Sequence, residues 1–545
     1  MNRLLKSPAK SRFYLIAAAA TGGAATITFH YRNPNHSSST FLNGVVRSSR
    51  ALFTVTRNVV DYKYSLHGLL PDSDEYEVEL SKVNLRSARR TLKLCETNRG
   101  FYVKAGQFAA AVRQVPKEYS LTLSSLRDQV HPCQFNLIKE VLVENLGPNF
   151  SDVFVSFDEQ PIAAASIAQV HHAVMKGHGE VAVKVQYPGL ESHMKFDFAT
   201  MNVLSKTIAW FFPEYRFGWL VEAFANSVVT ELDFIQEAKH TERMGENFRN
   251  NKMVEVPRIY WDHTTRQVLT MQFCEGKKVN DLEFLKLNGI SPVKVAKVLA
   301  EVCAEMIFVH GFLHGDLHPG NILVSPKGNG RFSLVLLDHG ICKQLDENFR
   351  ENYCQLWKAL IFMDSNKIQQ IGDQFGAGKY SRFFPVIFTG RPINSKSALG
   401  RGMSAEEKKI LRQELKSLKM EDVSSFMESL PPDFLSVLRT DGLLRSLISN
   451  LGASQQARLL AYAKYAMHSL YLRSNATSGF KMQATFTRFR NGVKYIQLRL
   501  ILELLGLFSW IEGKRGVFTQ LLQHIHYSIS NYLKSLLPLS RILIV

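Results

Sequence analysis

The stretch His310–Asn321, HGFLHGDLHPGN, constrains this 545-residue chain more than any other. Asp316 and Asn321 are five residues apart in a segment that is too polar for a strand and is interrupted by Pro319 and Gly320. The pattern predicts a loop that carries an acid followed by a metal-binding amide. The alternative is a polar loop whose Asp and Asn only cap local backbone groups.

The segments on either side favour the catalytic interpretation. A helix that opens at Ser291-Pro292 and ends at Gly311 precedes the loop, and an apolar β-rich run, Phe332–Leu337, follows it and stops at Asp338. Protein kinases use the same Asp-to-Asn spacing in their catalytic loop, and they place a metal-binding Asp before a glycine at a strand end. We therefore predict a catalytic acid and two Mg²⁺ ligands, namely Asp316, and Asn321 with Asp338.

A second strand supplies a lysine for nucleotide phosphates. Glu180–Gln186 reads EVAVKVQ, which places Lys184 with Ala182 on one strand face and the valines on the other. A kinase strand lysine binds the α and β phosphates and pairs with a helix glutamate. A buried lysine needs an anionic partner, and ELDFIQEA at 231–238, predicted to be helical, offers three candidates. The sequence does not say which of them pairs with Lys184: Glu231, Asp233 or Glu237.

Two further segments are predicted to contact ATP or ADP. PIAAASIAQVH at 161–171 lies where a kinase has its glycine-rich phosphate loop. Alanines remove the backbone freedom of glycine, so we expect a stiffer loop and a different nucleotide pose; taken alone, the segment reads as a small-residue turn. Val268–Phe273 is a predicted strand, and the hinge behind it is expected to meet adenine. The residues assigned to these contacts are Ala163, Ala164, Ala165 and Ser166 in the loop, and Gln272 and Cys274 in the hinge.

The chain ends suggest a membrane. No Asp or Glu precedes Asp61, although Arg and Lys do, which is typical of a mitochondrial import signal. Phe13–Tyr31 is uncharged, and we expect it to attach the protein to the inner membrane; a cleaved presequence and a secretory signal are the alternatives. Asn33–Thr40 is a predicted linker. The apolar tail, Tyr495–Val545, is predicted to form helices that pack on the fold or attach to a membrane surface.

The net charge of +18 suits an acidic partner. With no RNA-binding signature or zinc-finger spacing, anionic lipid and nucleotide rank above nucleic acid, which we do not expect to bind.

Six motifs in order resemble the UbiB, or aarF-domain-containing, atypical kinases over roughly residues 80–345: KAGQ, PIAAASIAQVH, VAVKVQYP, ELDFIQEA, HGDLHPGN and LDHG. The resemblance implies an α+β, bilobal protein-kinase-like fold with an N-terminal helical KxGQ extension and a helical C-terminal extension. It implies that Lys104 of KAGQ points into the active site and engages Glu231 and Asp233. Two positions depart from protein kinases, because Gly315 replaces an Arg and His318 replaces a Lys. Because Gly315 replaces the Arg, regulation through that Arg and a phosphorylated activation loop is not expected. His318 leaves open whether transfer to a protein is efficient.

The resemblance also implies a role in coenzyme Q or mitochondrial lipid homeostasis and in cristae, with isoprenoid lipid and mitochondrial membrane proteins as partners. We predict a Mg-nucleotide-dependent kinase or ATPase in which Lys184, Lys104 and Asp316 are catalytic. A pseudokinase scaffold and a small-molecule phosphotransferase are the alternatives. The predicted domains are a targeting segment or anchor at 1–31, a linker and helix at 32–80, the KxGQ extension at 81–150, the N-lobe at 151–281, the C-lobe at 282–475 and a helical extension at 476–545.

Overall fold

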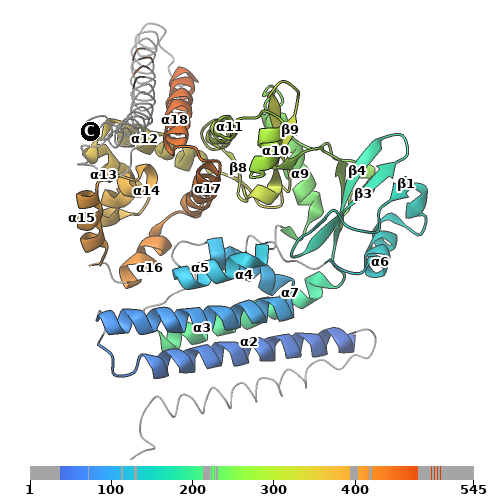
Figure 1. Cartoon of the computed structure of the whole chain (residues 1–545), viewed down its shortest axis with the longest axis horizontal. Helices are drawn as coiled ribbons and strands as arrows, with labels where there is room; N and C mark the ends of the chain where they lie inside the picture. Colours follow the sequence, from blue (N-terminus) through green and yellow to red (C-terminus); the bar gives the residue numbers. More distant parts are fainter. Residues whose placement is uncertain are drawn as a thin grey trace, which may run out of the picture. The chain divides into compact units, whose positions relative to one another are not determined.

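In the computed structural model the chain folds as two compact units. Figure 1 labels their helices and strands. The structure describes residues 37–70, 73–111, 115–127, 132–212, 231–392, 403–416 and 420–476, with single positions 221, 224, 225, 228, 493, 496, 500 and 504. Unit 1 comprises 1–291, 312–344 and 418–447, and unit 2 comprises the rest. Phe13–Tyr31 and nearly all of the apolar tail lie outside the described residues. Among the helices that are described, none has the length and apolarity needed to cross a membrane.

An antiparallel sheet in unit 1 carries Lys184. Its order is β1-β3-β4-β6, with β2 paired to β3. In β4 the valines at alternate positions are fully buried against α6, whereas Ala182 and Lys184 face the other side, as the strand pattern predicts. The bounds are β1 Phe154–Phe157, β2 Ala163–Ala164, β3 Ala168–Met175, β4 Gly179–Gln186, β6 Val268–Gln272 and α6 Phe135–Leu146.

A second sheet in unit 1 places the loop and the strand-end acid side by side. Antiparallel β9 and β10 pair Ile322 with Leu336. Asn321 directly precedes β9 and Asp338 follows β10 by two residues, so the pairing brings both to one edge of the sheet. The strands are β5 Val254–Glu255, β7 Lys277–Lys278, β9 Ile322–Pro326 and β10 Phe332–Leu336, beside a two-stranded sheet of β8 Phe312–His314 and β11 Cys342–Gln344.

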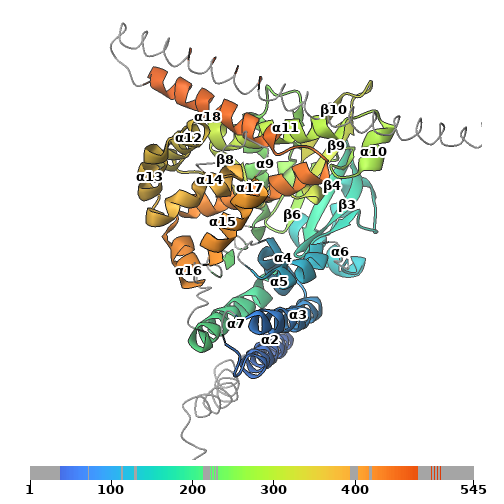
Figure 2. The ribbon, with the colours of Figure 1, turned by 60° about the vertical axis from the view of Figure 1, so that its left-hand side comes forward.

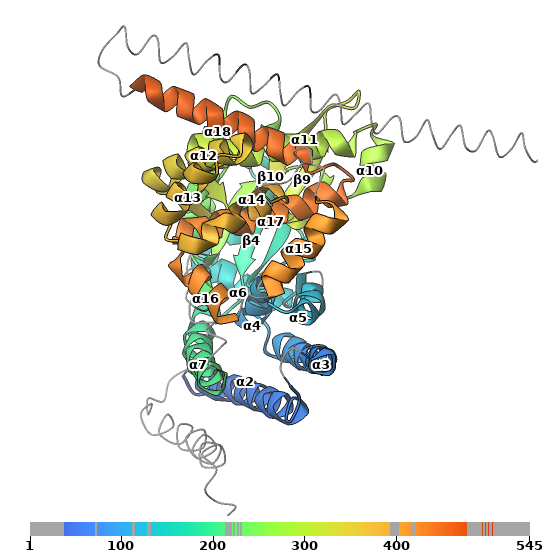
Figure 3. The ribbon, with the colours of Figure 1, turned by 90° about the vertical axis from the view of Figure 1, so that its left-hand side faces the viewer.

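Long helices form the N-terminal part of unit 1. α2 packs along both α3 and α7, and Figures 2 and 3 show the three helices side by side. In turn, α3 contacts α4 and α5. The bounds are α2 Ser37–Ser65, α3 Asp74–Asn98, α4 Phe101–Ala111, α5 Lys117–Leu123, α7 Leu190–Phe211, α9 Phe234–Asn247, α10 Leu282–Leu287, α16 Met420–Ser429 and, crossing into unit 2, α17 Pro432–Asn450.

Unit 2 is helical and has an aromatic core. Phe308 stacks on Tyr353, and Trp357 contacts Tyr462 edge to face. α11 passes into a π-helical turn, Glu305–His310, which ends at Gly311 with a φ of 59°. The helices are α11 Pro292–Ala304, α12 Glu347–Phe362, α13 Ser365–Gln374, α14 Phe384–Thr389, α15 Ala405–Lys416 and α18 Gln456–Ala476.

Two local predictions are wrong. The predicted linker at 33–40 overlaps α2, which already begins at Ser37. Serines are as typical of a helix N-terminus as of a linker, so composition alone misplaces this boundary. The predicted helix over 231–238 begins only at Phe234, because the side chain of Asp233 accepts a hydrogen bond from the Ile235 amide and caps the helix.

Asp61 of α2 holds this helix to α3. Its carboxylate accepts hydrogen bonds from Arg86 and lies 2.7 Å from Arg90, and Arg86 foremost holds the pKa of Asp61 down to about 2. A lowered folded-state pKa stabilises the fold above the unfolded value, and this contribution is lost as pH falls toward 2. We expect Asp61→Asn to lower the free energy of unfolding by about 1–2 kcal/mol at pH 7. The free energies of unfolding of the two proteins, measured in urea, should approach each other as pH falls from about 4 toward 2. A difference that stays constant down to about pH 2.5 would contradict the ion pair.

Candidate functional site

Lys184 is the charged centre of the site. Its ammonium lies 2.7 and 2.9 Å from the two carboxylate oxygens of Glu237 in α9, and 3.1 Å from Asp338. Lys184 and Glu237 are only 5% and 2% exposed. Burial lowers the pKa of Lys184, but the carboxylates of Asp338 and Glu237 outweigh it and raise the pKa above its usual value, so the lysine is charged. Burial raises the pKa of Glu237 to about 7 despite its lysine partner.

The three candidate acids, Glu231, Asp233 and Glu237, make different contacts in the structure. Glu237 pairs with Lys184, and Asp233 caps α9 and lies 3.9 Å from Arg266. The buried Glu231, which precedes the helix, lies 2.7 Å from the ammonium of Lys104. Asp233 therefore has no contact with either site lysine. Of the two acids that the resemblance assigns to Lys104, the structure pairs it with Glu231 and not with Asp233.

The KAGQ segment lies in α4, and its glycine permits close packing. A Cβ on Gly106 would meet the Leu126 side chain at 2.4 Å and Cys95 Sγ at 3.2 Å. Gln107 is anchored through its amide, which donates to the Leu126 carbonyl at 3.0 Å. Burial lowers the pKa of Lys104, but Glu231 and then Asp316 outweigh it and raise the pKa, so its ammonium is also charged.

Hydrogen bonds to backbone groups shape the predicted catalytic loop, His310–Asn321. The amide of Asp316 donates to Nδ1 of buried His314, and the side-chain amide of Asn321 donates to the Asp316 carbonyl at 3.2 Å. The Leu337 amide in turn donates to the Asn321 carbonyl at 2.8 Å. Burial raises the pKa of Asp316, but Lys104 and then Arg439 lower it further, so this carboxylate is ionised.

Asp338 occupies a strained backbone position. Its φ is +49°, in the left-handed region that few non-glycine residues adopt, and its carboxylate accepts from the Gly340 amide at 3.3 Å. The neighbouring His339 is buried and meets the Thr241 hydroxyl through Nδ1 at 3.2 Å. This geometry turns the carboxylate toward Lys184. Burial raises the pKa of Asp338, but Lys184 outweighs it and keeps the pKa well below its usual range.

The oxygen donors at Asn321 and Asp338 fit Mg²⁺. The side-chain nitrogen of Asn321 donates to the Asp316 carbonyl, and this bond fixes the orientation of the side-chain amide. The amide oxygen therefore points away from that carbonyl. The Asp338 side chain is 37% exposed, so it is open to a ligand. Among the described residues no cluster of three or more His, Cys, Asp or Glu side chains could hold a metal alone. Mg²⁺ commonly takes one or two protein ligands and completes its shell with phosphate and water oxygens.

The alanine-rich segment forms a short hairpin. Ala163 and Ala164 pair with β3, and the Ala165 amide donates to the Ala168 carbonyl at 2.8 Å. The Tyr187 hydroxyl donates to the Ala165 carbonyl at 3.0 Å. This pinning agrees with the expectation of a stiff loop. Ser166 is buried and lines a cavity of about 470 Å³ beside α4 and α7, which none of the site's lysines or acids lines.

The Gln272 amide is the last in β6 and donates to the Arg258 carbonyl at 2.8 Å. The adenine contact predicted for this residue stays a prediction. Cys274 follows the strand and stays a predicted adenine contact. At Gly276 a Cβ would lie 2.9 Å from the Val324 carbonyl, which explains the glycine where the chain leaves the sheet.

Sequence reasoning missed Arg439 of α17. Its guanidinium lies 3.5 Å from Asp316 and covers the Phe108 ring of α4 at 5.2 Å. At Gly315, where protein kinases have an Arg, a Cβ would lie 2.8 Å from Ile341 Cγ2, so no larger side chain fits. The cation beside the acid therefore comes from a distant helix. The absence of Arg at position 315 was the available signal, but no local motif marks position 439.

Comparisons with known proteins agree on one family. Residues 125–372 match the ABC1 atypical kinase-like domain. AarF domain-containing protein kinase 1 of Gallus gallus is 35% identical over 92% of this chain and 95% of its own length. The protein of the same name from Mus musculus is 34% identical over 92% and 96%. A solved complex of Rv3197 with erythromycin from Mycobacterium tuberculosis covers 71% of this chain and 99% of its own, at 20% identity and a TM-score of 0.45.

The Lys104–Glu231 pair should behave as a buried ion pair. Lys104→Met leaves the Glu231 carboxylate buried without its partner, so we expect a loss of about 3–5 kcal/mol in the free energy of unfolding, measured in urea. Adding Glu231→Gln should restore most of that loss. The exposed pair Lys82–Glu79, at 3.1 Å, is the control, and breaking it with Lys82→Met should change stability by less than about 1 kcal/mol. Equal, additive effects of the two site substitutions would contradict the pairing.

Proposed function

Because this chain belongs to the AarF domain-containing, or ABC1, family of atypical kinases, we propose that it binds an adenine nucleotide with Mg²⁺ and acts as an atypical kinase or ATPase. The predicted family and the α+β kinase-like fold with helical extensions are confirmed. The observation that carries the proposal is the buried cation Lys184 between Glu237 and Asp338. A lysine held in this way on a strand face, beside an edge with two oxygen donors, suits polyphosphate with a divalent cation.

Each side chain has a distinct task in this proposal. Lys184 orients the phosphates, and Asn321 and Asp338 hold Mg²⁺, which when bound neutralises phosphate charge. Asp316, ionised and fixed by its backbone bonds, orients or deprotonates the attacking hydroxyl or water. Catalysis of this kind is mainly positioning and charge neutralisation, and the ion pairs provide both.

The acceptor is proposed to be small or lipidic. Lys104 and Arg439 both place positive charge at Asp316, and Arg439 also covers Phe108 of α4. Side chains from two helical segments outside the ABC1 match thus surround the acid, which disfavours a protein segment as acceptor. We propose that nucleotide turnover supports mitochondrial lipid or coenzyme Q homeostasis and cristae maintenance at the inner membrane.

A second candidate function is a scaffold that binds nucleotide without transfer. The specific observation in its favour is that the Asp316 carboxylate already lies 3.5 Å from the Arg439 guanidinium. A carboxylate engaged by a cation is a weaker base. The two candidates differ in turnover and agree in nucleotide binding.

The first test is the thermal shift of the full chain with ATP or ADP, with and without Mg²⁺. A ligand that binds only the folded state stabilises it by about 2.7 kcal/mol at one hundred times its Kd. We expect a Mg²⁺-dependent shift that Asp338→Asn abolishes and that the exposed control Asp262→Asn keeps. No shift with either nucleotide in the parent protein would overturn the proposal.

The second test separates enzyme from scaffold. ATP turnover in anionic liposomes should fall at least about 100-fold in Asp316→Ala and Asp338→Asn, since each removes a group that acts on the reacting atoms. Nucleotide binding by Asp316→Ala, read by thermal shift, should persist. Equal turnover in the parent and both variants would reject the catalytic assignment, and a nucleotide shift without any turnover would favour the scaffold.

A further inference from the structure

One face of α2 packs against α7 and α3. A Cβ on Gly44 would lie 3.0 Å from the Phe196 ring of α7, so the helices approach closely. Arg47 forms an ion pair with the buried Asp197 of α7. Asp61 holds two arginines of α3. These contacts fix how α2 is rotated about its own axis, and therefore which residues face away.

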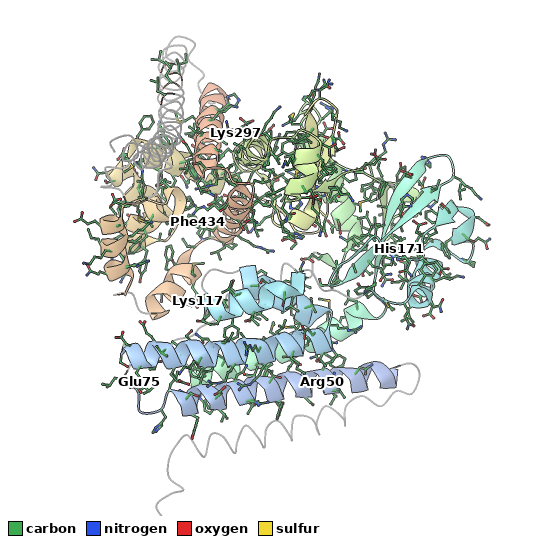
Figure 4. All side chains as sticks on the ribbon, viewed as in Figure 1. Arg50, Glu75, Lys117, His171, Lys297 and Phe434 are labelled. Atoms are coloured by element: carbon green, nitrogen blue, oxygen red, sulfur yellow. The ribbon has the colours of Figure 1, made fainter. Side chains whose placement is uncertain are left out.

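The residues that face away form a regular stripe. They follow each other at alternating spacings of four and three, which keeps them on one side of a helix. Phe53 is 69% exposed and Tyr64 is 85% exposed. Figure 4 labels Arg50 on this helix. We name the set the α2 stripe, and its members, all exposed, are Val46, Arg50, Phe53, Arg57, Val60 and Tyr64.

The α2 stripe carries only positive charge. The one acid in α2 is Asp61, whose side chain is 15% exposed and bound by α3. Large apolar side chains alternate with arginines, whereas a merely solvated helix face carries mixed charges and few large apolar groups. The stripe spans 19 residues, from Val46 to Tyr64, or about 27 Å at a rise of 1.5 Å per residue.

We propose that the α2 stripe lies on an anionic lipid bilayer, with Phe53 and its apolar neighbours at the acyl boundary and Arg50 and Arg57 on the headgroups. Apolar residues interleaved with cations suit that interface, where an arginine stem can lie along apolar surface while its head binds phosphate. A second copy of the chain fits poorly, because it would bring arginines against arginines. The inference rests on the membrane association within the proposed function.

The position of α2 in the chain supports the same occupant. The uncharged segment that ends at Tyr31 precedes Ser37 by six residues, which span at most about 22 Å. If that segment is attached to a bilayer, α2 starts close to it. In addition, α2 contacts α3, and α3 contacts α4, which carries Lys104. Contact with lipid would then be two helices away from the candidate site.

The decisive experiment reports on the stripe itself. Full-length Phe53→Trp is mixed with vesicles of phosphatidylglycerol and acyl-brominated phosphatidylcholine, since bromine quenches only a tryptophan that reaches the acyl region. The control Leu287→Trp puts a tryptophan at an 80% exposed site in α10, far from α2 in Figures 1 to 3. Relative to the parent protein, we expect the added emission to be quenched at position 53 and unaffected at position 287.

A second experiment removes the positive charges of the α2 stripe. Arg50→Gln with Arg57→Gln, introduced into Phe53→Trp, should raise the anionic-lipid concentration for half-maximal quenching by about 30-fold. Neither arginine belongs to the nucleotide site, so ATP turnover without vesicles should be unchanged. Equal quenching at positions 53 and 287, or quenching indifferent to charge removal, would overturn the inference.

Failure of the stripe can be told from failure of the proposed function. If the protein sediments with vesicles while Phe53→Trp stays unquenched, attachment is by another segment, the stripe proposal is wrong, and an acidic protein becomes its alternative occupant. The nucleotide thermal shift, measured without lipid, tests the proposed function independently of either outcome.

Discussion

The buried ammonium of Lys184 is the interaction on which the site depends. A charge with 5% exposure is stable only beside compensating charge, and Glu237 and Asp338 provide it from two different elements. The sheet, α9 and the end of β10 are therefore tied together by one cation. Because the partners are a rigid helix residue and a residue at a φ of +49°, the carboxylates are fixed before any ligand arrives.

A second layer of charge surrounds Asp316. Lys104 lies against Glu231, and Arg439 lies against Asp316 itself. These contacts come from α4 and α17, which have no counterpart in the motifs of the catalytic loop. Their effect is to keep Asp316 ionised while the space around it is occupied by cations. A small acceptor, or water, needs less displacement of these side chains than a protein segment does.

Sequence patterns predicted the features that depend on neighbouring residues in the chain. The alternation of EVAVKVQ placed Lys184 opposite the valines. The kinase-like motifs grouped Asn321 with Asp338 as metal ligands, and the pairing of β9 with β10 brings the two residues to one sheet edge. The partner of Lys184 required the helix start, which turns on a single hydrogen bond from the Ile235 amide to Asp233. Arg439 lay beyond prediction, because 123 residues separate it from Asp316 and no periodicity encodes that contact.

Packing at Gly315 explains why the cation beside Asp316 comes from another element. The Gly315 amide donates to the Ile341 carbonyl at 2.6 Å, and this close approach leaves no room for a side chain. A cation beside Asp316 must then reach it from elsewhere, and Arg439 does so. Both Arg439 and Lys104 lie outside residues 125–372, the part that matches the ABC1 domain. The matched domain alone therefore lacks two of the charges that set the protonation state of Asp316, and the complete arrangement requires the longer chain.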